Sequence, residues 1–272
     1  MSIDVTLSAS ARTNLSALQS TAQALQVTQS HLSTGKAVNS ASDNATAYFA
    51  SQGFLQRAND LSNLKNSLAT SLQTVTSVNQ SISDVTSVVQ QLEGITTQAL
   101  GTTDATTRAG LASQFNSLLT QLDLLVNDAT FNGTNLLNST GNTLVVYFNE
   151  KNTTALTITG VNITHAGLNI SSAANAFASN DNINTAGSLL LTALSTLRTD
   201  AANFGGNATL IQTRQDFTSN LINNLQNASN NLILADTNTE GANLQALQAQ
   251  NSLGIISLGI SGQLEQSILR LF

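Results

Sequence analysis

The amino-acid sequence predicts a mainly α-helical protein, in which both chain ends form a long antiparallel coiled-coil helical bundle and the middle forms a small β insertion. Three observations lead to this fold class. The 272 residues contain no proline, apolar residues recur in heptads on both sides of the middle, and residues 143–170 show short β-like alternation. Because proline inside a helix removes a hydrogen bond and clashes with the preceding turn, its absence suits long uninterrupted helices.

A regular heptad repeat of apolar residues runs from Leu61 to Ile95. Its members recur at heptad spacing in two interleaved series, which are Leu61, Leu68, Val75, Ile82 and Val89, and Val78, Val85 and Leu92. A repeat of about five heptads corresponds to roughly 50 Å of helix at about 1.5 Å per residue. A helix of that length would project from a domain of this size. The sequence therefore predicts partner helices along it.

Further apolar repeats are the candidate partner helices. A helix predicted over residues 111–125 is ended by the turn-like FNG of residues 131–133. A further helix over residues 190–201 is predicted to end before the glycine pair at 205–206, and a long repeat then covers residues 210–260. Because this last repeat reaches the C-terminal end, it is the natural partner of the helix predicted at the N-terminal end.

The N-terminal helix and the middle of the chain show different periodicities. Apolar residues at three- and four-residue spacing precede a break at Gly35, and they are Leu15, Leu18, Ala22, Leu25 and Leu32. Residues 143–170 are instead rich in Val, Thr and Ile, with turn residues between short runs. This composition predicts two to four β-strands. The predicted order is helices, a small β excursion, and helices again.

Composition excludes several classes of function. Charged residues make up 9% of the chain, and its nine cationic side chains are scattered within a net charge of -6, so no nucleic-acid-binding surface is expected. No window of about 18 apolar residues predicts a membrane span. The N-terminus lacks the basic and apolar regions of a cleavable signal peptide. Cysteine is absent, which excludes disulfides and thiolate chemistry.

No enzyme site, cofactor or metal is predicted. His31 and His165 have no second His or Cys at ligand spacing, so neither is expected to bind a metal or to catalyse a reaction. No serine lies in a nucleophile motif, and no glycine-rich phosphate loop follows a strand. The DTNTE segment at residues 236–240 lacks the central Gly and final Glu of a calcium loop. It is interpreted as a helix start, with Asp236 or Thr237 as the cap.

The segment LSTGKAVNSASDNATAYFAS, residues 32–51, resembles the N-terminal signature of bacterial flagellins. In that signature a helix ends in LS-S/T-G and continues as INSA-x-D-D-A-A-G. The matching residues are Leu32, Ser33, Gly35, Asn39, Ser40, Ala41, Asp43 and Ala45. FNGTNLLN at residues 131–138 resembles the FNG-x-x-LL turn of the family. The closing region also resembles that of flagellins, although Asn44 and Glu265 depart from the usual acid and proline.

The resemblance implies a structural protein, the subunit that polymerises into the bacterial flagellar filament for swimming motility. Family members leave the cell uncleaved through the flagellar export channel, so the implied location is the extracellular filament. Residues 1–40 with 235–272 would form a terminal coiled-coil layer, the inner core. Residues 41–140 with 186–234 would form a helical bundle layer, and 141–185 a surface-exposed β-rich insertion. The alternative is a hook–filament junction protein with flagellin-like termini.

The assembly interface is expected on the two chain ends and on the segment that follows Gly35. The candidate residues are Leu15, Leu18, Leu25, Leu32, Gly35, Asn39, Asp43, Leu253, Ile256, Ile260, Leu264, Ile268, Leu271 and Phe272. The implied partners are further copies of this chain, a flagellar export chaperone, and the hook-associated and cap proteins. Neither a nucleic acid nor a membrane is expected as a partner.

The family resemblance also bears on immune recognition. In many flagellins the outer face of the long helix carries L-Q-R-x-R-E-L, which the animal flagellin receptor contacts. In residues 89–94, Gln90 replaces the first arginine and Gly94 replaces the final leucine, while Glu93 is retained. Weak or absent recognition by that receptor is therefore expected.

Overall fold

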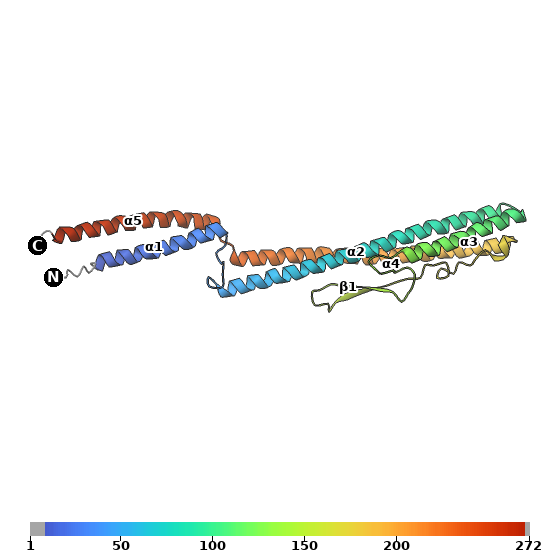
Figure 1. The fold of residues 1–272 in the computed structure, drawn as a ribbon, viewed down its shortest axis with the longest axis horizontal. Helices are drawn as coiled ribbons and strands as arrows, with labels where there is room; N and C mark the ends of the chain where they lie inside the picture. Colours follow the sequence, from blue (N-terminus) through green and yellow to red (C-terminus); the bar gives the residue numbers. More distant parts are fainter. Residues whose placement is uncertain (1–8, 270–272) are drawn as a thin grey trace. The chain divides into compact units, whose positions relative to one another are not determined.

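The computed structural model describes residues 9–269, which form five α-helices, one two-stranded sheet and a short 3-10 helix (Figure 1). In chain order the elements are α1 (Ala9–Thr34), α2 (Ala45–Leu100), α3 (Ala105–Asp128), β1 (Thr143–Tyr147), β2 (Ala155–Thr159), η1 (Ala174–Phe177), α4 (Asn180–Ile233) and α5 (Thr237–Leu269). The mainly helical class with a small β insertion is confirmed. Among the described helices, none has the length and apolarity that crossing a membrane requires.

The chain divides into two compact units. The first runs to Ala58 and resumes at Asn223, and the second is Asn59–Ile222. The first unit therefore contains α1, α5, the beginning of α2 and the end of α4. The second contains the rest of α2 and α4, together with α3 and the sheet.

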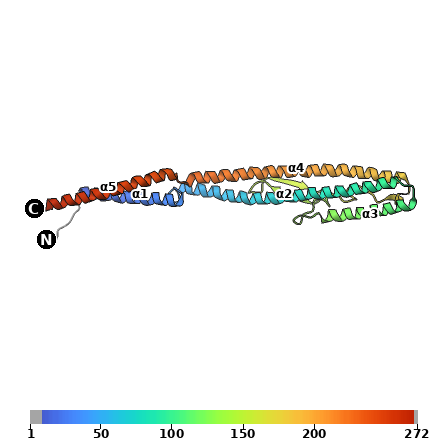
Figure 2. The same cartoon turned by 90° about the horizontal axis from the view of Figure 1, so that it is seen from above.

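The core of the second unit lies along α2. All eight members of the two heptad series between Leu61 and Leu92 are buried, with no more than 3% of any side chain exposed. The helices α3 and α4 lie beside α2 (Figure 2). Phe115 of α3 and Leu190 and Leu197 of α4 are fully buried. The apolar repeat thus correctly predicted the core helix and its need for partners.

A buried arginine connects three segments at one end of this core. Arg108, on α3, is only 6% exposed. Its Nε donates to the carbonyl of Thr102 at 2.7 Å, and its terminal nitrogens donate to the carbonyl of Ala178 and to Oδ1 of Asn180. The turn before α3 and the start of α4 are therefore held by one side chain.

The predicted helix end at the glycine pair 205–206 is wrong, because α4 continues through it from Asn180 to Ile233. Glycine in a helix interior costs about 1 kcal/mol relative to alanine. Phe204 and Ile211 on either side are buried at 2% and 0% exposure. Burial of two such side chains contributes roughly 3–6 kcal/mol, which exceeds the cost of the two glycines.

The β insertion is a single hairpin, at the lower end of the predicted two to four strands. Strands β1 and β2 are antiparallel, with Val145 opposite Thr157. Val146 and Ile158 point inward and are each 2% exposed, whereas Val145 and Tyr147 face solvent. Before the hairpin, the FNG segment forms the expected tight turn, in which Phe131 and Thr134 exchange both backbone hydrogen bonds at 2.9 Å.

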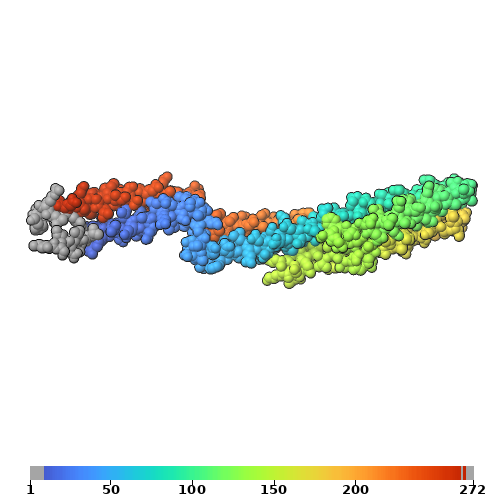
Figure 3. Space-filling view, in the orientation of Figure 1, coloured from blue at the N-terminus to red at the C-terminus, as the bar shows by residue number. Residues whose placement is uncertain are grey.

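In the first unit, α1 and α5 lie side by side in two views at right angles (Figures 1 and 2), and the space-filling view shows their surfaces in contact (Figure 3). The expected pairing of the N-terminal and C-terminal repeats is confirmed. In the same unit, α2 and α4 approach closely at two fully buried serines. The hydroxyls of Ser51 and Ser229 lie 2.8 Å apart.

Candidate functional site

The two terminal helices pair in an antiparallel sense through small and polar residues. Near the N-terminal end of α1, Nδ2 of Asn14 donates to the hydroxyls of Ser257 and Ser261 at 3.1 and 3.3 Å. One turn further along, Leu18 lies over Gly254, where a Cβ would be only 3.0 Å from the Cδ1 atom of Leu18. Glycine thus admits the leucine and helps to fix the register of the two helices.

This pairing covers only one side of each helix. The predicted α1 leucines, Leu15, Leu18, Leu25 and Leu32, are all half-buried. On α1 only Ala11 and Thr28 are buried. Among the α5 residues whose side chains are described, none is buried. A two-helix contact therefore leaves much of the apolar surface of the pair in solvent.

Four of the five large apolar side chains of α5 that are more than half exposed form one stripe, whereas the fifth, Ile255, is 56% exposed and lies on another side of the helix. Leu253, Ile256, Ile260 and Leu264 are 54–66% exposed, and we call these four residues the outer stripe. At about 100° per residue they span roughly 80° of the helix circumference. Gly254, against Leu18, lies outside that arc, so the outer stripe does not face α1.

The remaining C-terminal candidates cannot be placed on this stripe from the structure. The side chain of Ile268, and the residues Leu271 and Phe272, lie outside the described part of the chain. By sequence, Ile268 continues the four-residue spacing of Ile260 and Leu264.

A joint connects the ends of four helices within the first unit. The chain between α1 and α2 crosses the chain between α4 and α5, where Lys36 and Leu234 form an antiparallel bridge. Ala37 N donates to the carbonyl of Ile233 at 2.8 Å, and Ala235 N donates to that of Gly35 at 3.0 Å. We call residues 35–38 and 233–235 the joint.

Gly35 is required by backbone conformation rather than by close packing. Its φ is +69°, and no heavy atom lies within 4 Å of the position of a Cβ. A β-branched residue is strongly disfavoured at positive φ. The structure therefore gives Gly35 a role in the turn of the chain after α1 and not in close packing.

Asn39 and Asp43, two further candidates, shape the linker between α1 and α2. Oδ2 of Asp43 accepts from the backbone N–H groups of Asn39 and Ser40, both at 2.9 Å. The Asn39 amide in turn donates to the carbonyl of Lys36 at 3.2 Å. The backbone N–H groups of Ser40 and Asn39 are the main reason that the pKa of Asp43 is lowered.

Both histidines have carboxylate partners, which sequence reasoning missed. His31 Nδ1 lies 2.9 Å from Oε1 of Glu240, across the ends of α1 and α5. In the second unit, His165 Nδ1 lies 2.6 Å from Oδ2 of Asp123, which ties the segment after β2 to α3. Glu240 ends the DTNTE segment, but nothing local in the sequence pairs it with a histidine 209 residues away.

The predicted cap of α5 is confirmed. Asp236 Oδ1 accepts from the backbone N–H groups of Asn238 and Thr239 at 3.0 and 3.2 Å. Hydrogen bonds from Thr239, and then from Asn238, lower the pKa of Asp236. A carboxylate at this position also interacts favourably with the helix dipole.

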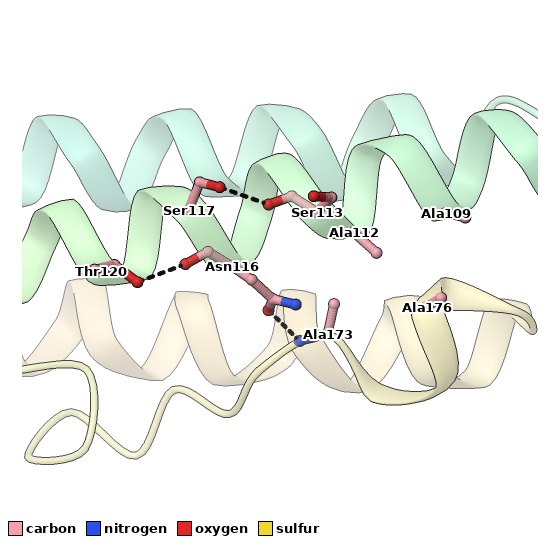
Figure 4. A pocket seen from close by; sticks show the side chains of 8 residues that line it. All are labelled: Ala109, Ala112, Ser113, Asn116, Ser117, Thr120, Ala173 and Ala176. Atoms are coloured by element: carbon pink, nitrogen blue, oxygen red, sulfur yellow. Dashed lines mark hydrogen bonds between the residues drawn. The ribbon is translucent and has the colours of Figure 1, made fainter.

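A shallow groove of about 460 Å³ lies between α3 and the segment that includes Ala173 and η1 (Figure 4). It is lined by Ala109, Ala112, Ser113, Asn116, Ser117, Thr120, Ala173 and Ala176. The hydroxyls of Ser117 and Thr120 donate to carbonyls of their own helix, and Asn116 Oδ1 accepts from the N–H of Ala173. These polar groups stabilise the local fold, and the lining residues include no base that could activate a hydroxyl.

Comparison with known proteins shows which family this chain resembles. Residues 5–142 match the bacterial flagellin N-terminal helical region. The chain is 28% identical over 259 residues to flagellin FljM of Caulobacter vibrioides, covering 94% of this chain and 93% of the relative. It is also 28% identical over 279 residues to a flagellin of Brucella melitensis, covering 97% and 96%.

The crystal structure of Bacillus cereus flagellin is similar in fold, with a TM-score of 0.50 at 16% identity, over 56% of this chain and 88% of that chain. The matched N-terminal region spans half of this sequence, and the alignments cover almost the whole length of both flagellins from Caulobacter vibrioides and Brucella melitensis. The chain belongs to the bacterial flagellin family, the non-enzymatic subunits that polymerise into the extracellular flagellar filament.

Proposed function

We propose that the outer stripe of α5 is the surface through which copies of this chain contact one another in the flagellar filament. The observation that carries this proposal is the exposure of all four aliphatic side chains, each more than half exposed in the isolated chain. Contiguous apolar surface on a soluble protein commonly marks an interaction site. By sequence, Ile268 continues the four-residue spacing of Ile260 and Leu264, and Leu271 follows Leu264 by seven residues.

Burial of this surface would contribute favourably to assembly. Burying the four side chains at roughly 1.5–3 kcal/mol each gives about 6–12 kcal/mol, before the entropy of ordering is subtracted. A contact between the stripe and a different surface of the next copy need not close on itself. Head-to-tail contacts of this kind build open helical polymers.

The remaining candidates support this surface from within the chain. Leu18 lies over Gly254 and helps to set the register of α5, and the other three α1 leucines are proposed to pack against α5 as well. Gly35, Asn39 and Asp43 shape the joint and linker from which both terminal helices extend. In this proposal residues 1–40 with 235–272 form the inner layer of the filament. Residues 41–140 with 186–234 form the surrounding helical layer, and residues 141–185 face outward.

The proposal extends to partners other than the chain itself. Hook-associated proteins have flagellin-like termini, so a filament end would meet them through the same outer stripe. The cap protein and an export chaperone are proposed from family membership. Recognition by the animal flagellin receptor is proposed to be weak, because the exposed residues of α2 there include Gln90 and Gly94 in place of arginine and leucine.

The test compares two substitutions at one position of the outer stripe. Ile256→Asn should leave a soluble monomer with unchanged helical circular dichroism, but little protein should sediment as filaments after seeding. Ile256→Leu keeps the apolar area and should polymerise like the unmodified chain. Deletion of residues 251–272 should abolish polymerisation while the core of the second unit stays folded. Long filaments from the deleted chain would disprove the proposal.

A further inference from the structure

The joint in the first unit contains a titratable contact that the assembly surface does not use. His31 is in the last turn of α1, and Glu240 is in the first turn of α5. Their side chains are only 19% and 17% exposed, and the Nδ1 to Oε1 distance is 2.9 Å. The contact therefore connects the two terminal helices close to the backbone hydrogen bonds of residues 35–38 and 233–235.

We propose that the His31–Glu240 contact is a pH-sensitive latch, which holds the joint closed when His31 is protonated and loosens it when His31 is neutral. A carboxylate only accepts hydrogen bonds, so His31 is the donor. A bond from a charged imidazolium is stronger than one from neutral imidazole. Histidine is the side chain that ordinarily changes charge between pH 5 and 8.

The charged groups around His31 also favour a closed joint when His31 carries a positive charge. Asp43 on the linker interacts electrostatically with it, and Asp236 caps α5 one turn before Glu240. The linker also contributes Lys36, whose side chain is exposed. Residues 217–233 at the end of α4 carry no charged side chain, and α2 carries none before Arg57. Loss of the proton therefore removes a cation from a region rich in carboxylates.

The neighbouring backbone hydrogen bonds report on the latch. The N–H groups of Ala37, Val38 and Ala235 are hydrogen-bonded only while the two segments of the joint stay together. Opening of the latch should thus raise their hydrogen-exchange rates, while the amides of the second unit should not change. This readout uses the monomer, so it does not depend on the outer stripe being the assembly surface.

The experiment measures hydrogen exchange of the full-length monomer at about pH 5.5 and about pH 7.5, corrected for intrinsic exchange. In the unmodified chain, protection at the joint should fall about 3- to 10-fold at the higher pH, as expected when a charged hydrogen bond becomes neutral. His31→Arg, with a permanent charge, should keep the protection at both values. His31→Gln and Glu240→Gln should show weak protection at both.

The second histidine provides the matched control. His165→Gln removes the other imidazole, in the second unit, and should leave the pH dependence at the joint unchanged. The latch would be disproved if protection in the unmodified chain did not change with pH. The same pH dependence in His31→Gln as in the unmodified chain would also disprove it.

Discussion

Along α2 in the second unit, the apolar repeat from Leu61 to Leu92 is buried against α3 and α4, whereas α5 in the first unit exposes its outer stripe to solvent. Both helices carry aliphatic residues at helical spacing, so periodicity alone does not distinguish a closed core from an assembly surface. The difference lies in the partners available within the chain. A helix with two neighbours can bury a wide apolar face, but α5 pairs with α1 through one stripe of small and polar residues.

The largest expected difference between the two regions is in the cost of removing a leucine. Leu68→Ala in the core should lower the free energy of unfolding of the second unit by about 3–5 kcal/mol, because the side chain is fully buried. Leu18→Ala in the half-buried terminal pair should cost about 1 kcal/mol or less. Urea denaturation of the monomer, followed by circular dichroism, measures both. Equal losses would show that the terminal pair is as well packed as the core.

The elements of the fold that were predicted from the sequence are those that local patterns determine. The heptads of α2, the hairpin, the FNG turn and the cap at Asp236 follow from local patterns and were predicted. The continuity of α4 was missed because two glycines suggested a break, while burial of Phe204 and Ile211 favours the helix. The backbone at residues 175–177 has positive φ at three consecutive non-glycine residues, which no local signal indicated.

The candidate site was less predictable than the core. The apolar residues of α5 were visible, but which of them face α1 depends on Asn14 and Gly254, whose contacts join residues more than 200 positions apart. Asn39 and Asp43 were recognised through a family motif, which gives no hydrogen-bond partners. The histidine pairs were missed for the same reason, because a contact between distant residues leaves no local periodicity.

The next prediction concerns the outward side of α2, the helix whose inward side forms the core. An arginine at the centre of an interface commonly contributes about 2 kcal/mol or more, or about 30-fold in affinity. Because Gln90 replaces the first arginine of the receptor-contacting motif, purified monomer should activate the animal flagellin receptor weakly in reporter cells. Gln90→Arg combined with Gly94→Leu should increase activation without affecting the buried Val89 and Leu92. Potent activation by the unmodified chain would contradict this expectation.

A smaller effect is expected at the joint of the first unit. Gly35→Val places a β-branched residue at a φ of +69°, which costs roughly 1–2 kcal/mol. Motility or filament straightness should decrease, while monomer helicity should stay nearly unchanged. Gly206→Val is the matched control, since this glycine lies inside α4 with no atom within 4 Å of a Cβ. If both variants swim normally and form filaments of unchanged shape, the conformation of Gly35 has no role in assembly.

The last prediction separates the two regions by their response to acid. The pKa values of Asp43 and Asp236, both in the first unit, are lowered by hydrogen bonds from backbone N–H groups and neighbouring hydroxyls. A carboxyl group whose pKa is lower in the folded than in the unfolded chain stabilises the fold above the unfolded value, near pH 4, and this stabilisation is lost as the pH falls through the folded value.

The second unit has one such group, Asp104, but it also has Asp200, whose pKa is raised by burial. For Asp200 the sign is reversed, because the folded chain then binds the proton more tightly and gains stability as the pH falls. Acidification from about pH 6 to about pH 3 should therefore increase hydrogen exchange at the joint more than in the core helices. Asn is also a good N-cap residue but carries no titratable group. In the variant Asp236→Asn, the increase in hydrogen exchange at the joint on acidification should therefore be smaller. Faster hydrogen exchange in the core helices of the second unit than at the joint, at about pH 3, would contradict this prediction.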